Sequence, residues 1–212
     1  MQQRSDRLAR ILEAKLVPAV RTRNGEQAMR ALRALHASSL AVFEIPLTVP
    51  DALHVLRQAR EELGSESLLG IGTVLDAESA RMALLSGADF LVSPALNLDV
   101  IAMARRYSVP VFPGALTPTE ILAAWEAGAD CIKVFPASAM GGPSYIKAVL
   151  APFPQVSLMP MGGVTLQSAA EYLRAGAALL GVGSDLVSLA ALDAGRDTDL
   201  TDLAERFIAA IR

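Results

Sequence analysis

Short apolar runs alternate with helix-like segments along the whole chain, and this alternation constrains the fold more than any other feature. The runs are too short for helices but long enough for buried strands, which is typical of βαβ units with a parallel sheet. Eight such runs occur, at residues 16–22, 40–47, 68–74, 90–95, 109–115, 131–136, 156–161 and 179–184. Eight parallel strands favour a closed (β/α)8 TIM barrel of the α/β class. An open doubly wound sheet is the alternative, because periodicity alone does not demonstrate closure.

The connections between the runs carry recognisable helix ends. Residues 86–89, 127–130 and 175–178 each place a glycine where a helix would end in the left-handed conformation before the next strand. The stretch 117–120, Thr-Pro-Thr-Glu, has an N-cap threonine, a proline at the first helical position and a glutamate three residues after the cap. We also expect a short helix before the first strand and a polar break at 193–199 before the last helix. No Pro/Gly/Ser-rich linker interrupts the alternation, so residues 1–212 are predicted to form a single domain.

The composition restricts the classes of function. With 212 residues, of which 52% are apolar and 19% charged, the chain can bury one large core. A net charge of −3 and scattered arginines give no footprint for nucleic acid, so small molecules are the expected partners. Charges interrupt the segment Met1–Leu16, which therefore predicts no signal peptide, and no apolar run is long enough to span a membrane. One cysteine, Cys131, and two histidines, His36 and His54, predict no disulfide, no metal site and a reduced, cytoplasmic setting.

Lys133 stands inside the apolar run 131–136, where a buried strand is expected to carry no charge. Of the 19 basic residues only three are lysines. Period-two alternation places Lys133 on the inner face of the barrel together with Cys131 and Phe135. Burial lowers the pKa of a lysine and frees the amine to attack a carbonyl, which favours Schiff-base chemistry. The alternative is a structural ammonium that reaches solvent or pairs with a carboxylate.

Two further charged residues are expected on the inner face at strand ends. Alternation groups Glu44 with Val42, and it groups Arg21 with Ala19. A glutamate near the amine would supply the proton shuttle that imine chemistry needs, and an arginine can hold a carboxylate or phosphate with two hydrogen bonds. The alternative for Glu44 is a structural role in which it neutralises Lys133 or Arg21.

Glycines end the last two predicted strands. Gly162 and Gly163 end the seventh strand, and Gly183 and Ser184 end the eighth. The loops after these two strands often bind phosphate in TIM barrels. One glycine pair indicates only a turn, but two glycine-bearing ends at these positions favour a phosphate site. No histidine lies near a strand end to activate Ser184, so a serine-hydrolase triad is not expected.

Several short motifs follow one another along the chain. They are Val42-Phe43-Glu44-Ile45-Pro46-Leu47, Gly72-Thr73-Val74, Ser93-Pro94, Pro113-Gly114, Ile132-Lys133-Val134-Phe135-Pro136-Ala137, Met161-Gly162-Gly163-Val164 and Gly183-Ser184. Together they resemble the 2-keto-3-deoxy-6-phosphogluconate / 4-hydroxy-2-oxoglutarate (KDPG/KHG) aldolase family, whose members are class I aldolases on a (β/α)8 barrel. The resemblance extends from Leu16 to about Val187. The chain looks closest to the 2-keto-3-deoxy-6-phosphogalactonate branch.

The resemblance implies a reaction and a role for each site residue. The reaction would be cleavage of a 2-keto-3-deoxy-6-phospho sugar acid, of the gluconate or galactonate type, to pyruvate and glyceraldehyde 3-phosphate. Cleavage of 4-hydroxy-2-oxoglutarate to pyruvate and glyoxylate is a further expectation. Lys133 would form the imine, Glu44 would be the acid and base, Thr73, Pro94 and Phe135 would line the pyruvate pocket, and Gly162, Gly163, Gly183 and Ser184 would hold the phosphate. No metal or organic cofactor is expected, and the resemblance suggests a homotrimer in carbohydrate metabolism of the Entner-Doudoroff type.

Two positions depart from the phosphogluconate pattern. Members of that type commonly have an arginine four residues after the glutamate and a threonine before the glycine pair, where this chain has Thr48 and Met161. We therefore expect Arg21 to replace the missing arginine as the carboxylate clamp. Two other functions stay open at this point, namely a phosphosugar isomerase or epimerase and a non-catalytic sugar-phosphate-binding barrel.

Overall fold

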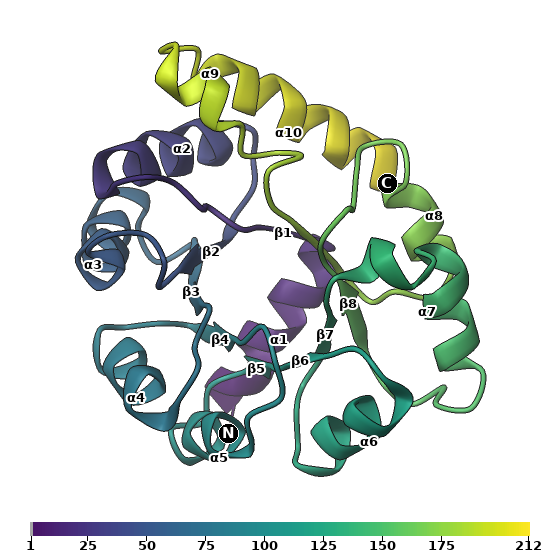
Figure 1. Ribbon diagram of the computed structural model, residues 1–212. Coiled ribbons are helices and arrows are strands. Elements are labelled where there is room, and N and C mark those ends of the chain that lie inside the picture. The colour runs from purple at the N-terminus through teal and green to yellow at the C-terminus, as the bar shows by residue number, and fades with distance from the viewer. Residues whose placement is uncertain (1) are drawn as a thin grey trace.

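The computed structural model describes residues 2–212 and forms a (β/α)8 barrel. In Figure 1 the strands form a central ring, the helices surround it, and α1 lies across one end. The strands are β1 (Leu16–Pro18), β2 (Val42–Pro46), β3 (Leu68–Gly72), β4 (Phe90–Val92), β5 (Val111–Phe112), β6 (Gly114–Ala115), β7 (Ile132–Val134), β8 (Leu158–Pro160) and β9 (Leu180–Val182). All eight expected runs are present, but the strands are shorter than their runs at one or both ends.

Parallel pairing closes the ring. The strands pair in the orders β2-β3-β4-β5 and β6-β7-β8, and β9 pairs with β1. Single bridges join Ala19 to Glu44 and Met161 to Gly181, which connects β1 to β2 and β8 to β9. The expected fifth run becomes β5 and β6, separated by Pro113, which has no N–H to donate. The Pro113 carbonyl instead accepts from the Lys133 N–H at 2.9 Å, so both halves occupy one strand position.

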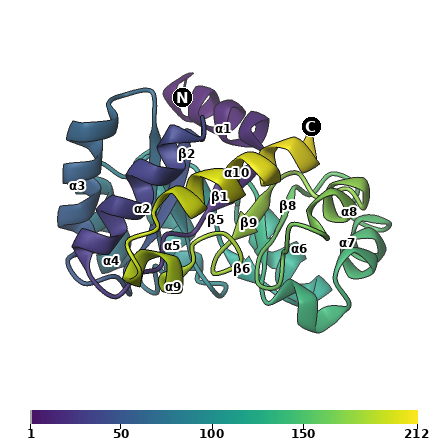
Figure 2. The same ribbon diagram turned by 90° about the horizontal axis from the view of Figure 1, so that it is seen from above.

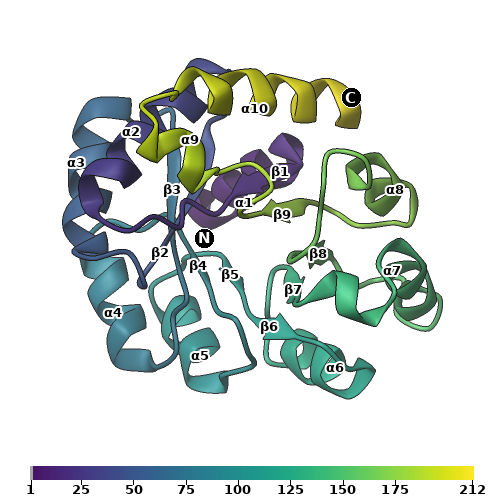
Figure 3. The same ribbon diagram turned by 45° about the horizontal axis from the view of Figure 1, so that its top comes forward.

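Helices form the outer layer and cover one end of the barrel. They are α1 (Gln2–Ala14), α2 (Gly25–Ala37), α3 (Ala52–Leu63), α4 (Ala77–Leu85), α5 (Leu98–Arg106), α6 (Pro118–Glu126), the 3-10 helix η1 (Ala137–Met140), α7 (Pro143–Leu150), α8 (Ala169–Arg174), α9 (Leu189–Asp193) and α10 (Thr198–Ile211). Seen from the side, α1 lies outside the ring at one end (Figure 2). The last two helices, α9 and α10, pack beside α2 and complete the outer layer (Figure 3). Within residues 2–212, none of the helices combines the length and apolar character needed to cross a membrane.

The expected helix ends are confirmed. Thr117 accepts from the Glu120 N–H and the Glu120 side chain accepts from the Thr117 N–H, so α6 begins with a complete capping box. Gly87, Gly128 and Gly176 have φ angles of 96°, 92° and 103°, which is the left-handed conformation that favours glycine after a helix.

Two apolar layers hold the barrel together. One fills the space between strands and helices and includes Ile132 and Val134. The other fills the barrel interior and includes Cys131, Val42 and Ala19. Because Cys131 points inward while Ile132 and Val134 point outward, the alternation along β7 places Lys133 on the inner face, as expected.

Ion pairs fix α1 against the barrel. Arg4 and Arg7 of α1 pair with Asp130 at 2.7 Å and with Asp89 at 3.1 Å, and Asp89 also pairs with Arg60 of α3. Both aspartates follow a Gly-Ala helix end and accept a strand N–H, Asp89 that of Leu69 at 2.9 Å and Asp130 that of Val111 at 2.9 Å. The carboxylates therefore bind a strand and α1 at the same time.

Replacing Asp89 with alanine tests this account of the closed end. Asp89 is buried and bonded to two guanidinium groups and one backbone N–H. Its loss leaves these donors unsatisfied, so we expect the free energy of unfolding to fall by about 2–4 kcal/mol. Urea unfolding measures the change.

Asp193→Ala is the matched control. Asp193 pairs with Arg23 at 2.7 Å on the surface, so its loss is expected to cost less than about 1 kcal/mol. Equal losses in the two variants would contradict the special role of Asp89.

Candidate active site

A cavity of about 280 Å³ opens at the end of the barrel where the strands terminate. It is lined by Ala19, Arg21, Glu44, Lys133, Phe135, Met161, Gly162, Gly163, Gly183, Ser184, Asp185, Val187 and Leu189. Eight of the ten residues expected at the site therefore share one cavity. The remaining two, Thr73 and Pro94, follow β3 and β4 at the same mouth but are not part of its lining.

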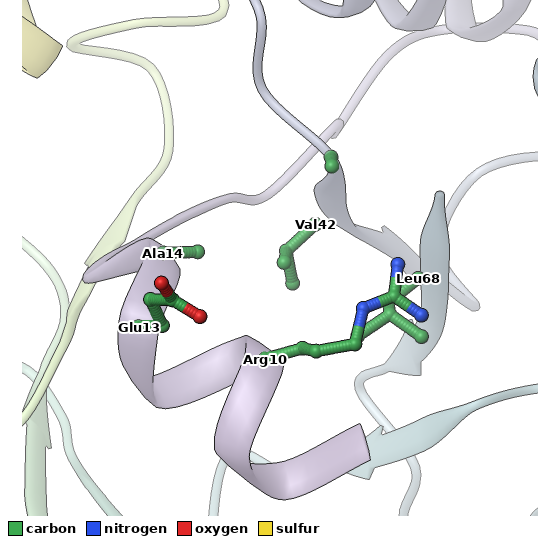
Figure 4. Close-up of a pocket in the computed structure, with 6 residues that line it drawn as sticks. Arg10, Glu13, Ala14, Val42 and Leu68 are labelled. Carbon is green, nitrogen blue, oxygen red and sulfur yellow. The ribbon is translucent and has the colours of Figure 1, made fainter. Parts of the chain in front are cut away.

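A hollow at the opposite end of the barrel differs in chemistry. It measures about 220 Å³ and lies between α1 and the first residues of β2 and β3 (Figure 4). Its charged residues, Arg10 and Glu13, are both exposed to solvent. Neither of these charged side chains is buried, so the cavity at the mouth of the barrel is the better candidate for chemistry.

Lys133 is buried at the mouth, with only 4% of its surface exposed. On β7 it lies between Gly114 of β6 and Met159 of β8. Its Nζ lies 5.0 Å from the centre of the Phe135 ring. Burial lowers the pKa of Lys133, the nearby Arg21 lowers it further, and Glu44 opposes the shift. The amine can therefore lose its proton more readily than an exposed lysine.

Glu44 is buried even more completely, and its Oε2 atom has no hydrogen-bond partner within the described chain. Burial raises the pKa of this carboxyl, whereas Lys133 and Arg21 lower it. No direct ion pair joins Glu44 to Lys133 among the described residues. A β-carbon on Gly72 of the neighbouring strand would overlap with Glu44 Oε1, so glycine is required there to give the carboxylate room.

Arg21, Thr73 and Pro94 lie around this pair. Arg21 lines the cavity with an exposed side chain. Thr73 has a φ of 57°, an unusual left-handed conformation for a β-branched residue. Strained residues of this kind often occur at functional sites. Pro94 lies so close to Gly114 that a β-carbon on Gly114 would overlap with the Pro94 carbonyl.

The far wall of the cavity consists of glycine turns. Gly162 and Gly163 have φ angles of 84° and 77°. Beyond β9, the carbonyl of Gly183 accepts from the N–H groups of residues 186 and 187, which forms a single helical turn. Such turns expose backbone N–H groups and suit an anion.

The sequence did not single out several residues of the lining. Asp185 lies in the loop after β9 and Leu189 is the first residue of α9, and the only available signal was that both follow the end of a strand. Met161 was recognised only as a departure from a motif, whereas the structure places it on the wall of the cavity. Among residues 2–212, no three His, Cys, Asp or Glu side chains lie close enough together to hold a metal ion.

The chain is similar in sequence to known proteins. A family model described as KDPG and KHG aldolase matches residues 8–203. The chain is 36% identical over 172 residues to the 2-dehydro-3-deoxy-6-phosphogalactonate aldolase of Escherichia coli strain K12, covering 81% of this chain and 83% of that protein.

Solved structures agree with this similarity. KDPG aldolase from Legionella pneumophila, captured with pyruvate as a covalent carbinolamine intermediate, matches with a TM-score of 0.86 at 28% identity, covering 94% of this chain and 96% of that one. A cube-shaped protein cage designed by fusing symmetric oligomeric domains matches with a TM-score of 0.84 at 32% identity, covering 92% of this chain and 71% of that one. The family match spans most of the chain and includes every residue of the cavity lining. The chain therefore belongs to the KDPG and KHG aldolase family and is a carbon–carbon lyase.

Proposed function

We propose that this aldolase forms a Schiff base through Lys133 and cleaves a 2-keto-3-deoxy-6-phospho sugar acid, of the gluconate or galactonate type, to pyruvate and glyceraldehyde 3-phosphate. The observation that carries the proposal is a buried amine that shares one cavity with a buried carboxyl, one oxygen of which has no hydrogen-bond partner among the residues that the structure describes. The names of the similar proteins support the substrate class, because one is a phosphogalactonate aldolase and another was captured with pyruvate as a carbinolamine.

The cycle uses these two groups in turn. The neutral Lys133 amine attacks the 2-keto carbon, and Glu44 moves the protons that convert the carbinolamine to a protonated imine with loss of water. Glu44 then takes the proton of the C4 hydroxyl while the C3–C4 bond breaks, and the bonding electrons move into the imine to give an enamine. Glyceraldehyde 3-phosphate leaves. Protonation at C3 and hydrolysis release pyruvate and restore the amine.

The pyruvate half of the substrate would lie near Arg21. Its guanidinium can bind the carboxylate with two hydrogen bonds, and the residue at the position of the usual family arginine, Thr48, has no charge. Phe135 lines the cavity beside the amine, and Thr73 and Pro94 follow neighbouring strands at the mouth. We assign Thr73, Pro94 and Phe135 to the pyruvate pocket.

The phosphate half would lie against the glycine turns. Gly162, Gly163 and Gly183 allow the backbone to approach an anion closely, and Ser184 adds a hydroxyl donor. These loops follow the seventh and eighth strand positions, where TIM barrels often bind phosphate.

The same cycle would also act on 4-hydroxy-2-oxoglutarate, which carries the same 2-keto and C4 hydroxyl groups and would yield pyruvate and glyoxylate. The family description, which includes KHG aldolase, supports this second substrate. A phosphosugar isomerase or a non-catalytic binding barrel would need no neutral amine, so the lowered pKa of Lys133 favours the aldolase over both.

We further propose that the enzyme is a cytoplasmic homotrimer. Leu75, Met82, Leu85 and Leu98 are each more than half exposed on α4, α5 and the loop before α4. Asn97 donates to the Leu75 carbonyl at 2.9 Å, so the loop before α4 and the start of α5 lie side by side. An exposed apolar face of this kind marks a protein interface. The related chain in the designed cage, which was built from symmetric oligomeric domains, supports self-assembly.

Trapping with borohydride tests the Schiff base directly. When pyruvate and sodium borohydride are added together, we expect a reduced adduct that peptide mass spectrometry locates on Lys133, because only a neutral amine forms the imine. Lys15 and Lys147 are exposed and serve as internal controls. Absence of the adduct, or its appearance on either control lysine alone, would rule out the mechanism.

Glu44→Gln tests the proton shuttle. The amide keeps the size of the side chain but neither takes nor gives the proton, so we expect kcat for cleavage to fall by roughly 10²- to 10⁴-fold. Steady-state assays of pyruvate release measure it, with Glu61→Gln, an exposed glutamate on α3, as control. A variant with nearly normal kcat would show that Glu44 is structural.

Arg21→Ala tests the carboxylate clamp. Loss of the two hydrogen bonds should raise KM for pyruvate about tenfold or more in the condensation direction. Arg23→Ala is the matched control, since Arg23 is exposed and pairs with Asp193 away from the cavity lining. An unchanged KM for pyruvate in the Arg21 variant would assign the carboxylate to other groups.

A further inference from the structure

Among residues 2–212, no cationic side chain belongs to the glycine-lined wall of the cavity. The two cationic residues of the lining, Arg21 and Lys133, are assigned above to the pyruvate end, and Asp185 adds a negative charge next to Ser184. A phosphate bound at this wall must therefore be held by neutral donors. Each hydroxyl near the wall then contributes a large share of the binding, because hydrogen bonds to an ionised group are roughly twice as strong as neutral ones.

Ser138 places such a hydroxyl beside the wall, in contact with Gly163 but outside the cavity lining. It lies in η1, directly after the strand that carries Lys133, and its N–H donates to the Gly162 carbonyl at 3.1 Å. A β-carbon on Gly163 would overlap with Ser138 Oγ, so the hydroxyl lies against the α-carbon of a residue that lines the cavity. The loop after β7 and the glycine turn after β8 thus meet at Ser138.

The Ser138 hydroxyl also has no structural task. Within the described chain its Oγ makes no hydrogen bond, and the side chain is exposed. Ser144 of the following helix differs, because its Oγ donates to the Gly141 carbonyl at 2.9 Å and stabilises the turn. Ser138 is therefore free to bind a ligand.

We propose that Ser138 is a phosphate-binding residue of this enzyme, donating its hydroxyl to the distal phosphate alongside Ser184 and the glycine turns. The proposal rests on the function proposed above and extends its phosphate site to the loop after β7. The proposal also adds a second reason for the glycine at position 163. The φ of 77° disfavours other residues, and a side chain would occupy the place of the hydroxyl.

Ser138→Ala tests the proposal through a pair of acceptor aldehydes. In the condensation direction with pyruvate, we expect kcat/KM for glyceraldehyde 3-phosphate to fall about tenfold, which is the effect of losing one hydrogen bond to a charged group. The value for unphosphorylated glyceraldehyde should stay within about twofold, because this acceptor offers no phosphate to the hydroxyl.

Two further variants act as controls. Ser184→Ala should show the same selective loss, whereas Ser144→Ala should change neither acceptor, since its hydroxyl is already bound to the chain. An equal fall for both acceptors in Ser138→Ala, or no fall for the phosphorylated one, would overturn the proposal.

Binding of inorganic phosphate separates this proposal from the aldolase mechanism. Isothermal titration of the intact enzyme should show weaker phosphate binding in Ser138→Ala than in the wild type, whatever happens to the Lys133 adduct. If phosphate binds equally to both proteins, Ser138 is not a ligand even when the borohydride adduct forms. If the Lys133 adduct is absent but phosphate binds more weakly to Ser138→Ala, the aldolase mechanism is wrong and Ser138 is still a phosphate-binding residue.

Discussion

The burial of two opposite charges, Lys133 and Glu44, at the mouth of the barrel is the constraint on which the site depends. Burial penalises each charged form, so the pKa of the amine falls and that of the carboxyl rises, while their attraction opposes both shifts only in part. One dehydrated environment therefore yields both an amine that can lose its proton and a carboxyl that can carry one. Gly72 belongs to the same arrangement, because any side chain there would displace the Glu44 carboxylate.

The site, whose buried charges are unfavourable for folding, lies at one end of the barrel, and the interactions that stabilise the fold lie elsewhere. Ion pairs of Asp89 and Asp130 with arginines fix α1 at the closed end, and apolar side chains such as Cys131 and Met159 fill the interior. At the mouth, by contrast, a buried oxygen of the Glu44 carboxylate has no hydrogen-bond partner within residues 2–212, and Thr73 adopts a strained backbone conformation. Such costs are tolerated where the surrounding structure fixes the residue.

The sequence was sufficient to predict the fold and the inward position of Lys133 and Glu44, because both depend on periodicity. Alternation with a period of two correctly placed Lys133 and Glu44 on the inner face. The division of the fifth strand at Pro113 was missed, since it depends on which neighbour each half pairs with. Contacts between distant loops were missed as well, because they depend on how the chain is arranged in space. Ser138 lies against Gly163, and Asp185 is part of the cavity lining. Only the resemblance assigned Thr73 and Pro94 to the pyruvate pocket, and they lie at the mouth outside the lining.

The central claim is that burial lowers the pKa of Lys133 more than the Glu44 carboxylate raises it, and a titration of the lysines tests it most directly. With three lysines in the chain, selective isotope labelling gives three resolvable NMR signals, and Lys15 and Lys147 serve as exposed references. We predict a pKa for Lys133 below that of both references, and a still lower pKa in Glu44→Gln, because the carboxylate favours the charged amine. A Lys133 pKa equal to the references, or one that is unaffected by Glu44→Gln, would contradict this account.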